Sequence, residues 1–244
     1  MKNLLNPANL KPLKPASLVA LTTLLLFFLG PGLKAQNCST YYPIEEGVRL
    51  EYKLYGKKDK LEGTQWQEFT EVTSTAGGVE ATVQMGFANA KGKEEFTSSY
   101  SMSCNDNVVH IDFESLLSSA MLLQQEQMEA EITGTDLELP NNLEVGMELP
   151  DADVQMKLSM GAMNMNMEVN TTDRKVEAKE SITTEAGTFE CYVISSNTQS
   201  KMMMADKTFP SKLWLAEGVG MVKTETYNQN GKLISRMELS GISR

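Results

Sequence analysis

Polar and apolar residues alternate most regularly between Val154 and Val169. If Gly161 and Ala162 are the two loop residues of a hairpin, every pair of opposed residues is either wholly apolar or wholly polar. The apolar pairs are Met160/Met163, Leu158/Met165, Met156/Met167 and Val154/Val169, and the polar pairs are Ser159/Asn164, Lys157/Asn166 and Gln155/Glu168. Because opposed side chains share a face of an antiparallel pair, the pattern predicts a two-faced hairpin. Glycine at the first loop position fits a type II′ turn.

A similar alternation recurs along the rest of the chain and predicts further strands joined as a meander of hairpins. These strands cover residues 48–54, 65–73, 79–87, 96–104, 109–113, 176–182, 189–193, 213–223 and 233–239, with one more beginning near Lys201. Residues 134–150 follow no period and are expected to be irregular. The last hairpin is expected to turn at residues 228–231, where asparagine and glycine interrupt the pattern.

One segment, from Ser115 to about Glu131, has a different period. Its apolar residues fall near every third or fourth position, with glutamines and glutamates between them; they are Leu116, Leu117, Met121, Met128 and Ile132. This spacing predicts one amphipathic helix capped by Ser115. The expected fold class is therefore all-β with one helix, as a large curved antiparallel sheet or open half-barrel wrapped around that helix.

Residues 1–35 have the pattern of an export signal. Three lysines precede an apolar run over residues 18–29, and a Leu-Lys-Ala sequence ends at Ala35, so cleavage there would leave Gln36 as the mature N-terminus. The apolar run is shorter than the roughly 20 residues of a membrane span. Residues 36–244 are expected to form a single antiparallel β domain, located in the periplasm, at the outer membrane or outside the cell.

Three cysteines, Cys38, Cys104 and Cys191, would reach an oxidising compartment. They permit one disulfide and one free thiol, but the sequence does not choose among the three pairings, and three buried thiols are the alternative. Lipid attachment at Cys38 fits poorly, because Asn37 stands where a lipoprotein signal has a small residue.

The acidic balance limits the partners. Loss of the four lysines of residues 1–35 leaves 18 basic and 32 acidic residues, a net charge of −14. Such a chain is repelled by nucleic acid and by anionic membrane surfaces. We expect a monomer without a transmembrane span after signal cleavage, whose partner is a lipid or an envelope protein.

Catalytic motifs are not evident. His110 is the single histidine, so a Ser-His-Asp triad would have to include it and a multi-histidine zinc site is ruled out. His110 is expected to be exposed or locally bonded on a strand. Asp151 and Asp153 are interpreted as turn acids, and Gly218-Val219-Gly220 as a bulge or tight turn. A carboxylate pair for glycoside hydrolysis stays open, but a non-catalytic protein without a cofactor is the expectation.

Two hypotheses use the apolar face of the hairpin. In the first, an acyl chain or other apolar ligand contacts that face and the predicted helix, through Met156, Leu158, Met160, Met163, Met165, Met167, Leu117 and Met121. In the second, the thioethers of Met163, Met165 and Met167 bind Cu(I), with Met156 and Met160 opposite them. Methionine is also an ordinary filler of apolar cores, so a packed face without a ligand is the third interpretation.

Three motifs resemble a known family. They are Tyr42-Pro43 with Gly47 and Glu51-Tyr52, then Gly187-Thr188-Phe189-Glu190-Cys191, and then Trp214 with Gly218-Val219-Gly220-Met221-Val222-Lys223. Together they resemble the TapB-like family of exported bacterial domains of unknown function, over nearly all of the mature chain. The resemblance implies an antiparallel β fold similar to the half-barrel of the LolA and LolB lipoprotein carriers, and it implies no catalytic residues.

Overall fold

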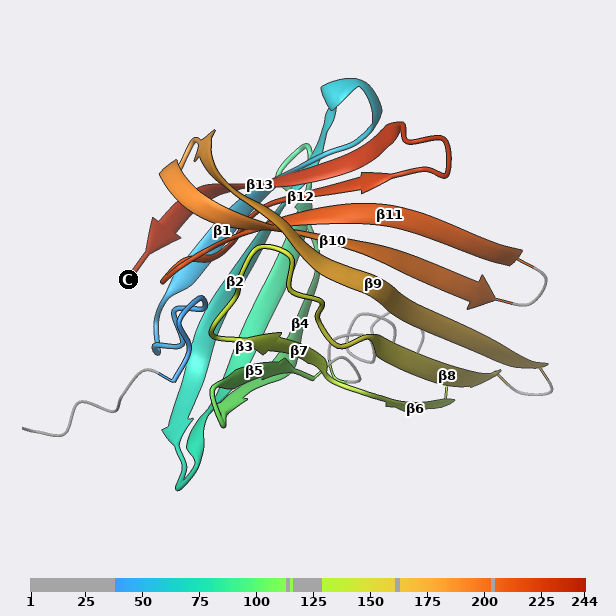
Figure 1. Ribbon diagram of the computed structural model, residues 1–244. Helices are drawn as coiled ribbons and strands as arrows, with labels where there is room; N and C mark the ends of the chain where they lie inside the picture. The colour runs from blue at the N-terminus through green and yellow to red at the C-terminus, as the bar shows by residue number, and fades with distance from the viewer. Residues whose placement is uncertain (1–37, 113–114, 116–128, 161–162, 203–204) are drawn as a thin grey trace, which may run out of the picture. The chain divides into compact units, whose positions relative to one another are not determined.

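The computed structural model describes residues 38–112, 115, 129–160, 163–202 and 205–244, all within one compact unit. These residues form one curved antiparallel sheet of 13 strands (Figure 1). The strands are β1 (Arg49–Tyr55), β2 (Leu61–Ser74), β3 (Gly78–Asn89), β4 (Glu94–Asn105), β5 (Val108–Ile111), β6 (Glu129–Gly134), β7 (Leu137–Pro140), β8 (Ala152–Met160), β9 (Met163–Thr184), β10 (Gly187–Met202), β11 (Ala205–Ala216), β12 (Gly220–Tyr227) and β13 (Leu233–Ser243). The expectation of an all-β fold built on one antiparallel sheet is confirmed.

The sheet is not closed. Its strand order is β6-β8-β9-β10-β11-β12-β13-β1-β2-β3-β4-β5-β7, so β6 and β7 are its two edges. These two strands are consecutive in the sequence, with only Thr135 and Asp136 between them. The Cα atoms of Gly134 and Leu137 therefore lie at most about 11 Å apart, because each peptide step spans about 3.8 Å. The sheet curls until its edges approach at this point, although no ladder joins them.

The hairpin register predicted from the alternation is confirmed. Met160 lies opposite Met163, and the pairing continues without a shift to Val154 and Val169. The loop residues 161–162 lie outside the described residues, so the turn type stays a prediction. The second strand does not end at Val169, however, because it is part of β9, which has 22 residues and ends at Thr184.

The polar stretch that separates Val169 from Val176 is part of β9, although its sequence predicts no strand. It pairs with β10 through a register shift between Ser195 and Asn197. Asp173 has a φ of 53° in this stretch, and the Asn197 side chain donates a hydrogen bond to its carboxylate at 2.9 Å. A β-bulge thus absorbs the irregular polar residues and lets the strand continue.

The predicted helix over residues 115–131 lies mostly outside the described residues. For its C-terminal end, from Glu129 onward, the prediction of a helix is wrong. Residues from Glu129 onward form strand β6, with Ile132 opposite Met156. Over so short a stretch the helical and strand periods overlap, and pairing with β8 decides between them. The segment 134–150 also contains a strand, β7, that its sequence does not predict. Among the described residues no helix reaches seven residues; a 3₁₀ turn covers Lys57–Asp59.

The main core lies on one face of the sheet, which we call the inner face and define by the buried Leu50 and Tyr52 of β1. Two irregular segments pack against it: residues 38–48, through Tyr41 and Ile44, and residues 141–149, through Leu143 and Leu149. Their apolar side chains complete the core on this part of the inner face.

Candidate ligand-binding face

Burial on the inner face changes along several strands. On β3, Val83 is fully buried, whereas Met85 and Phe87 on the same face are half-buried. On β4, Met102 is buried and Phe96 is half-buried. Side chains on one face of a strand recur every second residue, so the inner face passes from a buried part to a partly accessible part.

Three further strands repeat this gradient. On each of them a buried residue has a half-buried neighbour two positions away on the same face. The pairs are Tyr52 and Leu54 of β1, Leu215 and Leu213 of β11, and Leu239 and Met237 of β13. The pairing register places Leu54 opposite Met237. The accessible part therefore extends over at least five strands of the sheet.

Six half-buried side chains define this region, which we call the apolar end: Leu54, Met85, Phe87, Phe96, Leu213 and Met237. Phe87 lies opposite Phe96, and their rings stack with centroids 5.6 Å apart. A Cβ atom built at Gly63 of β2 would lie 2.7 Å from the Phe87 ring. The ring thus occupies the space that the glycine leaves free and connects the aromatic pair to Leu54, which is opposite Gly63.

The methionine hairpin forms a separate cluster. Met156 is 1% exposed and packs with Ile132, Val154 and Val169, and Met167 contacts this group. The backbone register alone locates Leu158, Met160, Met163 and Met165, because their side chains lie outside the described part of the structure, as do Leu117 and Met121. The structure brings Met156 and Met167 together and does not join them to the apolar end.

The Cu(I) hypothesis stays a prediction, because the side chains of Met163 and Met165 are not described. Within the described ranges no group of three or more histidine, cysteine or acidic side chains could hold a metal ion. Met156 packs in an apolar cluster, an environment that thioethers commonly fill without a metal.

The sequence did not single out the apolar end. Its residues belong to strands that it predicts correctly, and nothing in a two-residue alternation distinguishes Val83 from Phe87. The available signal was the placement of Phe87 and Phe96 on either side of one predicted turn, which brings two large rings together at a strand end.

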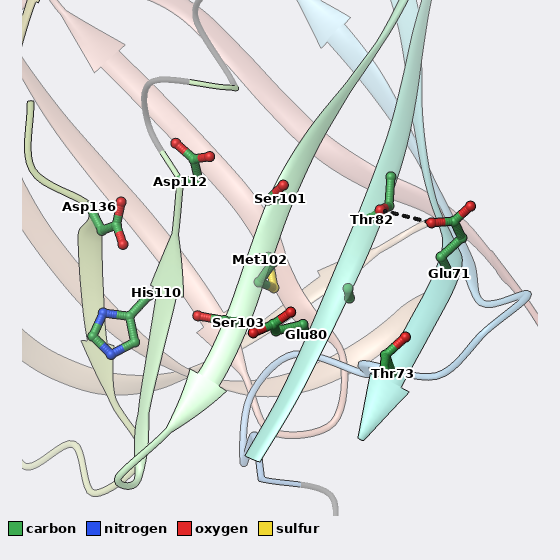
Figure 2. Close-up of a pocket in the computed structure, with 11 residues that line it drawn as sticks. Glu71, Thr73, Glu80, Thr82, Ser101, Met102, Ser103, His110, Asp112 and Asp136 are labelled. Atoms are coloured by element: carbon green, nitrogen blue, oxygen red, sulfur yellow. Dashed lines mark hydrogen bonds between the residues drawn. The ribbon is translucent and has the colours of Figure 1, made fainter. Parts of the chain in front are cut away.

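His110 lies on the opposite, outer face, in a polar hollow of about 280 Å³ (Figure 2). Its Nδ1 atom is 3.8 Å from a carboxylate oxygen of Glu138, the residue opposite it on β7. His110 thus lies next to an acidic side chain, at a distance longer than a hydrogen bond. Asp112 and Asp136 line the same hollow, and partial burial together with the charge of Asp112 raises the pKa of Asp136 above its usual 3.8.

Replacing Asp136 with asparagine should stabilise the protein at neutral pH. A raised pKa means that the folded state favours the protonated acid, so ionisation lowers stability as the pH rises through that pKa. The gain should be at most about 1 kcal/mol, because Asp136 is exposed to solvent, and should vanish below pH 3.8, where the acid is protonated in both states. Urea unfolding at neutral and low pH measures it, with Glu46→Gln as an exposed control; an equal gain at both pH values would contradict this explanation.

Arg174 of β9 is a buried cation, 6% exposed. It donates hydrogen bonds to the carbonyl oxygens of Pro150 and, at 2.9 Å, Glu138. Burial lowers its pKa. Since Glu138 belongs to the edge strand β7, the guanidinium connects this edge of the sheet to the middle of strand β9. A cavity of about 480 Å³ adjoins Arg174 and is also lined by Asp151.

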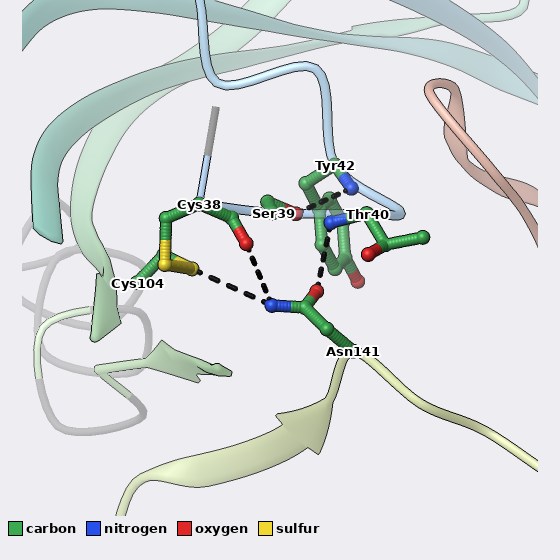
Figure 3. Close-up of a disulfide and its surroundings, with 6 residues drawn as sticks. All are labelled: Cys38, Ser39, Thr40, Tyr42, Cys104 and Asn141. Carbon is green, nitrogen blue, oxygen red and sulfur yellow. Dashed lines mark hydrogen bonds between the residues drawn. A yellow bond between two sulfur atoms is a disulfide. The ribbon is translucent and has the colours of Figure 1, made fainter. Parts of the chain in front are cut away.

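The structure selects one of the three cysteine pairings, Cys38 with Cys104 (Figure 3). The Asn141 amide donates to the Cys38 carbonyl oxygen at 2.7 Å and accepts from the Thr40 backbone N–H at 2.8 Å. Cys191 is a free, buried thiol, and burial raises its pKa to about 11. The disulfide and Asn141 together fix the segment that covers the inner face.

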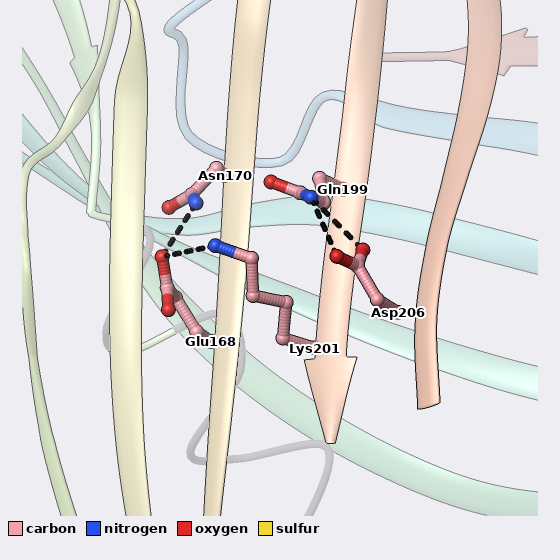
Figure 4. A network of polar contacts seen from close by, with 5 residues as sticks. All are labelled: Glu168, Asn170, Gln199, Lys201 and Asp206. Atoms are coloured by element: carbon pink, nitrogen blue, oxygen red, sulfur yellow. Dashed lines mark hydrogen bonds and ion pairs between the residues drawn. The ribbon is translucent and has the colours of Figure 1, made fainter. Parts of the chain in front are cut away.

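A polar network lies on β9, β10 and β11, on the face of the sheet opposite the Val169 side chain (Figure 4). The carboxylate of Glu168 accepts from Asn170 at 2.6 Å and pairs with Lys201 at 3.3 Å, and these contacts lower its pKa. Gln199 donates to both oxygens of Asp206. Glu168 is polar and the next residue, Val169, is buried on the opposite face, so this part of β9 has one polar and one apolar face, as the alternation predicts.

The motif around Trp214 has a structural role. Trp214 is buried on the outer face with Cys191, and its indole N–H donates to Glu180 at 2.5 Å. The Lys223 ammonium lies 4.7 Å from the centre of the Trp214 ring. The expected tight turn is confirmed at Gly218, whose backbone N–H binds the Thr40 carbonyl oxygen at 2.9 Å. The motif therefore connects the β11–β12 turn to the segment of residues 38–48 through a backbone hydrogen bond.

A model of the family described as DUF3108-like matches residues 45–239. The chain belongs to the DUF3108-like family. A search of curated proteins gave no significant match to this DUF3108-like chain. The comparisons do not confirm the more specific likeness to the TapB-like family or to LolA and LolB.

Two solved structures share the fold of the DUF3108-like chain. One, from Bacteroides fragilis, is described as an exported protein with a YmcC-like fold; it is 20% identical, with a TM-score of 0.70 over 85% of this chain and 100% of that chain. The other, from Parabacteroides distasonis, is described as a lipoprotein; it is 24% identical, with the same TM-score and coverage. None of the described residues forms a helix with the length and hydropathy of a membrane span.

Proposed function

We propose that this DUF3108-like chain is an exported, non-catalytic protein of the cell envelope that binds a lipid acyl chain at the apolar end of its inner face. The observation that carries the proposal is the set of half-buried side chains Leu54, Met85, Phe87, Phe96, Leu213 and Met237 on the same face as the core. Large apolar residues grouped on a partly accessible surface are typical of a binding site.

Several observations support export. Residues 1–35 have the pattern of a signal segment. The disulfide between Cys38 and Cys104 is typical of an oxidising compartment. Two proteins of the same fold are described as exported or as a lipoprotein. The periplasm, the surface of the outer membrane and the medium all satisfy these conditions.

The available area favours reversible binding. Full burial of one large apolar side chain contributes about 1.5–3 kcal/mol. At least about two thirds of each of the six side chains is already buried, so completing their burial contributes at most about 3–6 kcal/mol. Association itself costs an estimated 4–15 kcal/mol. The gain and the cost are of similar size, which suits a ligand that is taken up and released, whereas a permanently bound group would need a larger surface.

A non-catalytic role is part of the proposal. His110, the single histidine of the sequence, lies on the outer face beside Glu138, so it faces away from the apolar end. None of the six described side chains that define the apolar end carries a charged group that could act as an acid or base; they are hydrocarbon, aromatic or thioether. The site is suited to binding by contact area.

Native mass spectrometry of the protein purified from its own cell envelope tests the proposal. We expect a lipid-sized adduct on the unmodified chain and its loss in Phe96→Asp, because a carboxylate on the inner face would have to be desolvated by the ligand. Thr97→Asp is the matched control: the neighbouring residue on β4 is exposed and points to the other face. It should keep the adduct.

Two results would count against the ligand. The unmodified chain could carry no adduct, or Thr97→Asp could lose it as completely as Phe96→Asp. A co-purifying protein in place of a lipid, released only by Phe96→Asp, would assign the apolar end to a protein partner. Thermal unfolding of both variants shows whether the fold is kept.

A further inference from the structure

The sulfur of Cys38 decides how this chain is held in the envelope. A lipoprotein is anchored through a thioether between the sulfur of its N-terminal cysteine and a diacylglycerol. In the structure the same sulfur atom is bonded to Cys104. A cysteine sulfur forms one bond beyond its Cβ, so the disulfide and the lipid thioether exclude one another.

The surroundings of Cys38 agree with this conclusion. Its partner Cys104 is fully buried, and the Cys38 side chain packs against the core of the domain. Ser39, the next residue, and Tyr41 are 5% and 2% exposed, although Thr40 between them is exposed. A lipid on Cys38 would have to leave the domain at a point where the chain is already packed against the inner face.

We infer that Cys38 of this chain carries no lipid and that the Cys38–Cys104 disulfide takes the place of an anchor at that residue. The inference rests on the exported location in the proposed function. A protein of the same fold is described as a lipoprotein, so the fold would include both an anchored and an unanchored member.

The covalent step is a thiol–disulfide exchange after export. The thiolate of one cysteine attacks a disulfide of an exported oxidase, and the second thiolate displaces that oxidase from the mixed disulfide. The two cysteines together lose two protons and two electrons, and the oxidase leaves as a dithiol. Cys191 does not compete, because it is buried and its pKa is raised to about 11, which keeps it as the unreactive thiol.

Peptide mass analysis of the chain purified from its own cells tests the inference. The protein is denatured and alkylated without reduction, and then digested. We expect one alkyl group, on Cys191, a cross-linked pair of peptides that contains Cys38 and Cys104, and no lipid mass. A diacylglyceryl mass on Cys38, or alkylation of all three cysteines in the mature chain, would overturn it.

A second measurement separates this inference from the proposed function. After cell fractionation, Cys38→Ser should distribute between membrane and soluble fractions as the unmodified chain does; the control is Cys104→Ser, which breaks the same disulfide and keeps Cys38. A shift from membrane to soluble fraction in Cys38→Ser alone would show an anchor at this residue. Retention of residues 1–35 on the purified chain would instead refute export, and absence of a bound lipid would refute only the ligand.

Discussion

Replacing Cys38 with serine should lower the free energy of unfolding by about 4 kcal/mol, according to the loop-entropy account of disulfides. The bond joins residues 66 positions apart, so its loss releases a long loop in the unfolded state. It also frees the segment that places Tyr41 and Ile44 in the core. Denaturant unfolding of the oxidised protein and the variant measures the difference.

The control is a reductant. It should destabilise the unmodified protein by a similar amount and leave Cys38→Ser unchanged, because Cys191, the remaining cysteine outside this bond, is a free thiol. If the reductant had no effect on the unmodified protein, the disulfide would not contribute to stability. Equal stability of Cys38→Ser and the unmodified chain would lead to the same conclusion.

Replacing Arg174 with methionine should destabilise the protein by about 3 kcal/mol, because the carbonyl oxygens of Pro150 and Glu138 lose a charged donor and a hydrogen bond to a charged group contributes about 1.5–3 kcal/mol. Both hydrogen bonds come from a side chain that is 6% exposed. Methionine keeps much of the apolar stem, so the measurement isolates the guanidinium. Denaturant unfolding at neutral pH is the appropriate measurement.

Lys175→Met is the matched control for Arg174→Met. Lys175 is the next residue of β9 and is exposed, and surface substitutions usually change stability by less than about 0.5 kcal/mol. If both variants lost the same stability, removal of any positive charge from this part of β9 would explain the effect, and the contact between Arg174 and the β7 edge would not.

The alternation of residue types predicted more than the fold class. In the hairpin of β8 and β9, a shift of one residue would have exposed Met156 and Val169 and buried Gln155 and Glu168. Only one register buries the apolar side chains, and the structure has that register. The same reasoning located most of the other strands, because each places one apolar face against the core.

The alternation failed where pairing with a distant strand outweighs local pattern. The polar residues around Asp173 form strand because β10 supplies hydrogen-bond partners and a bulge takes up the irregular residue. Glu129 to Gly134 form β6 because β8 offers a free edge, although their spacing also suits a helix turn. Strand propensity depends on the neighbouring strand to a greater extent than helix propensity depends on tertiary contacts.

The sequence alone determined that the chain forms an antiparallel sheet, the register of the Val154–Val169 hairpin and the tight turn at Gly218, because each follows from residues close together in the chain. The tertiary structure decided the Cys38–Cys104 pairing, the burial of Arg174 and the division of the inner face into a buried part and an apolar end. Each of these features depends on contacts between segments that are far apart in the sequence. A local pattern specifies which face a side chain takes, but only the folded chain specifies what covers it.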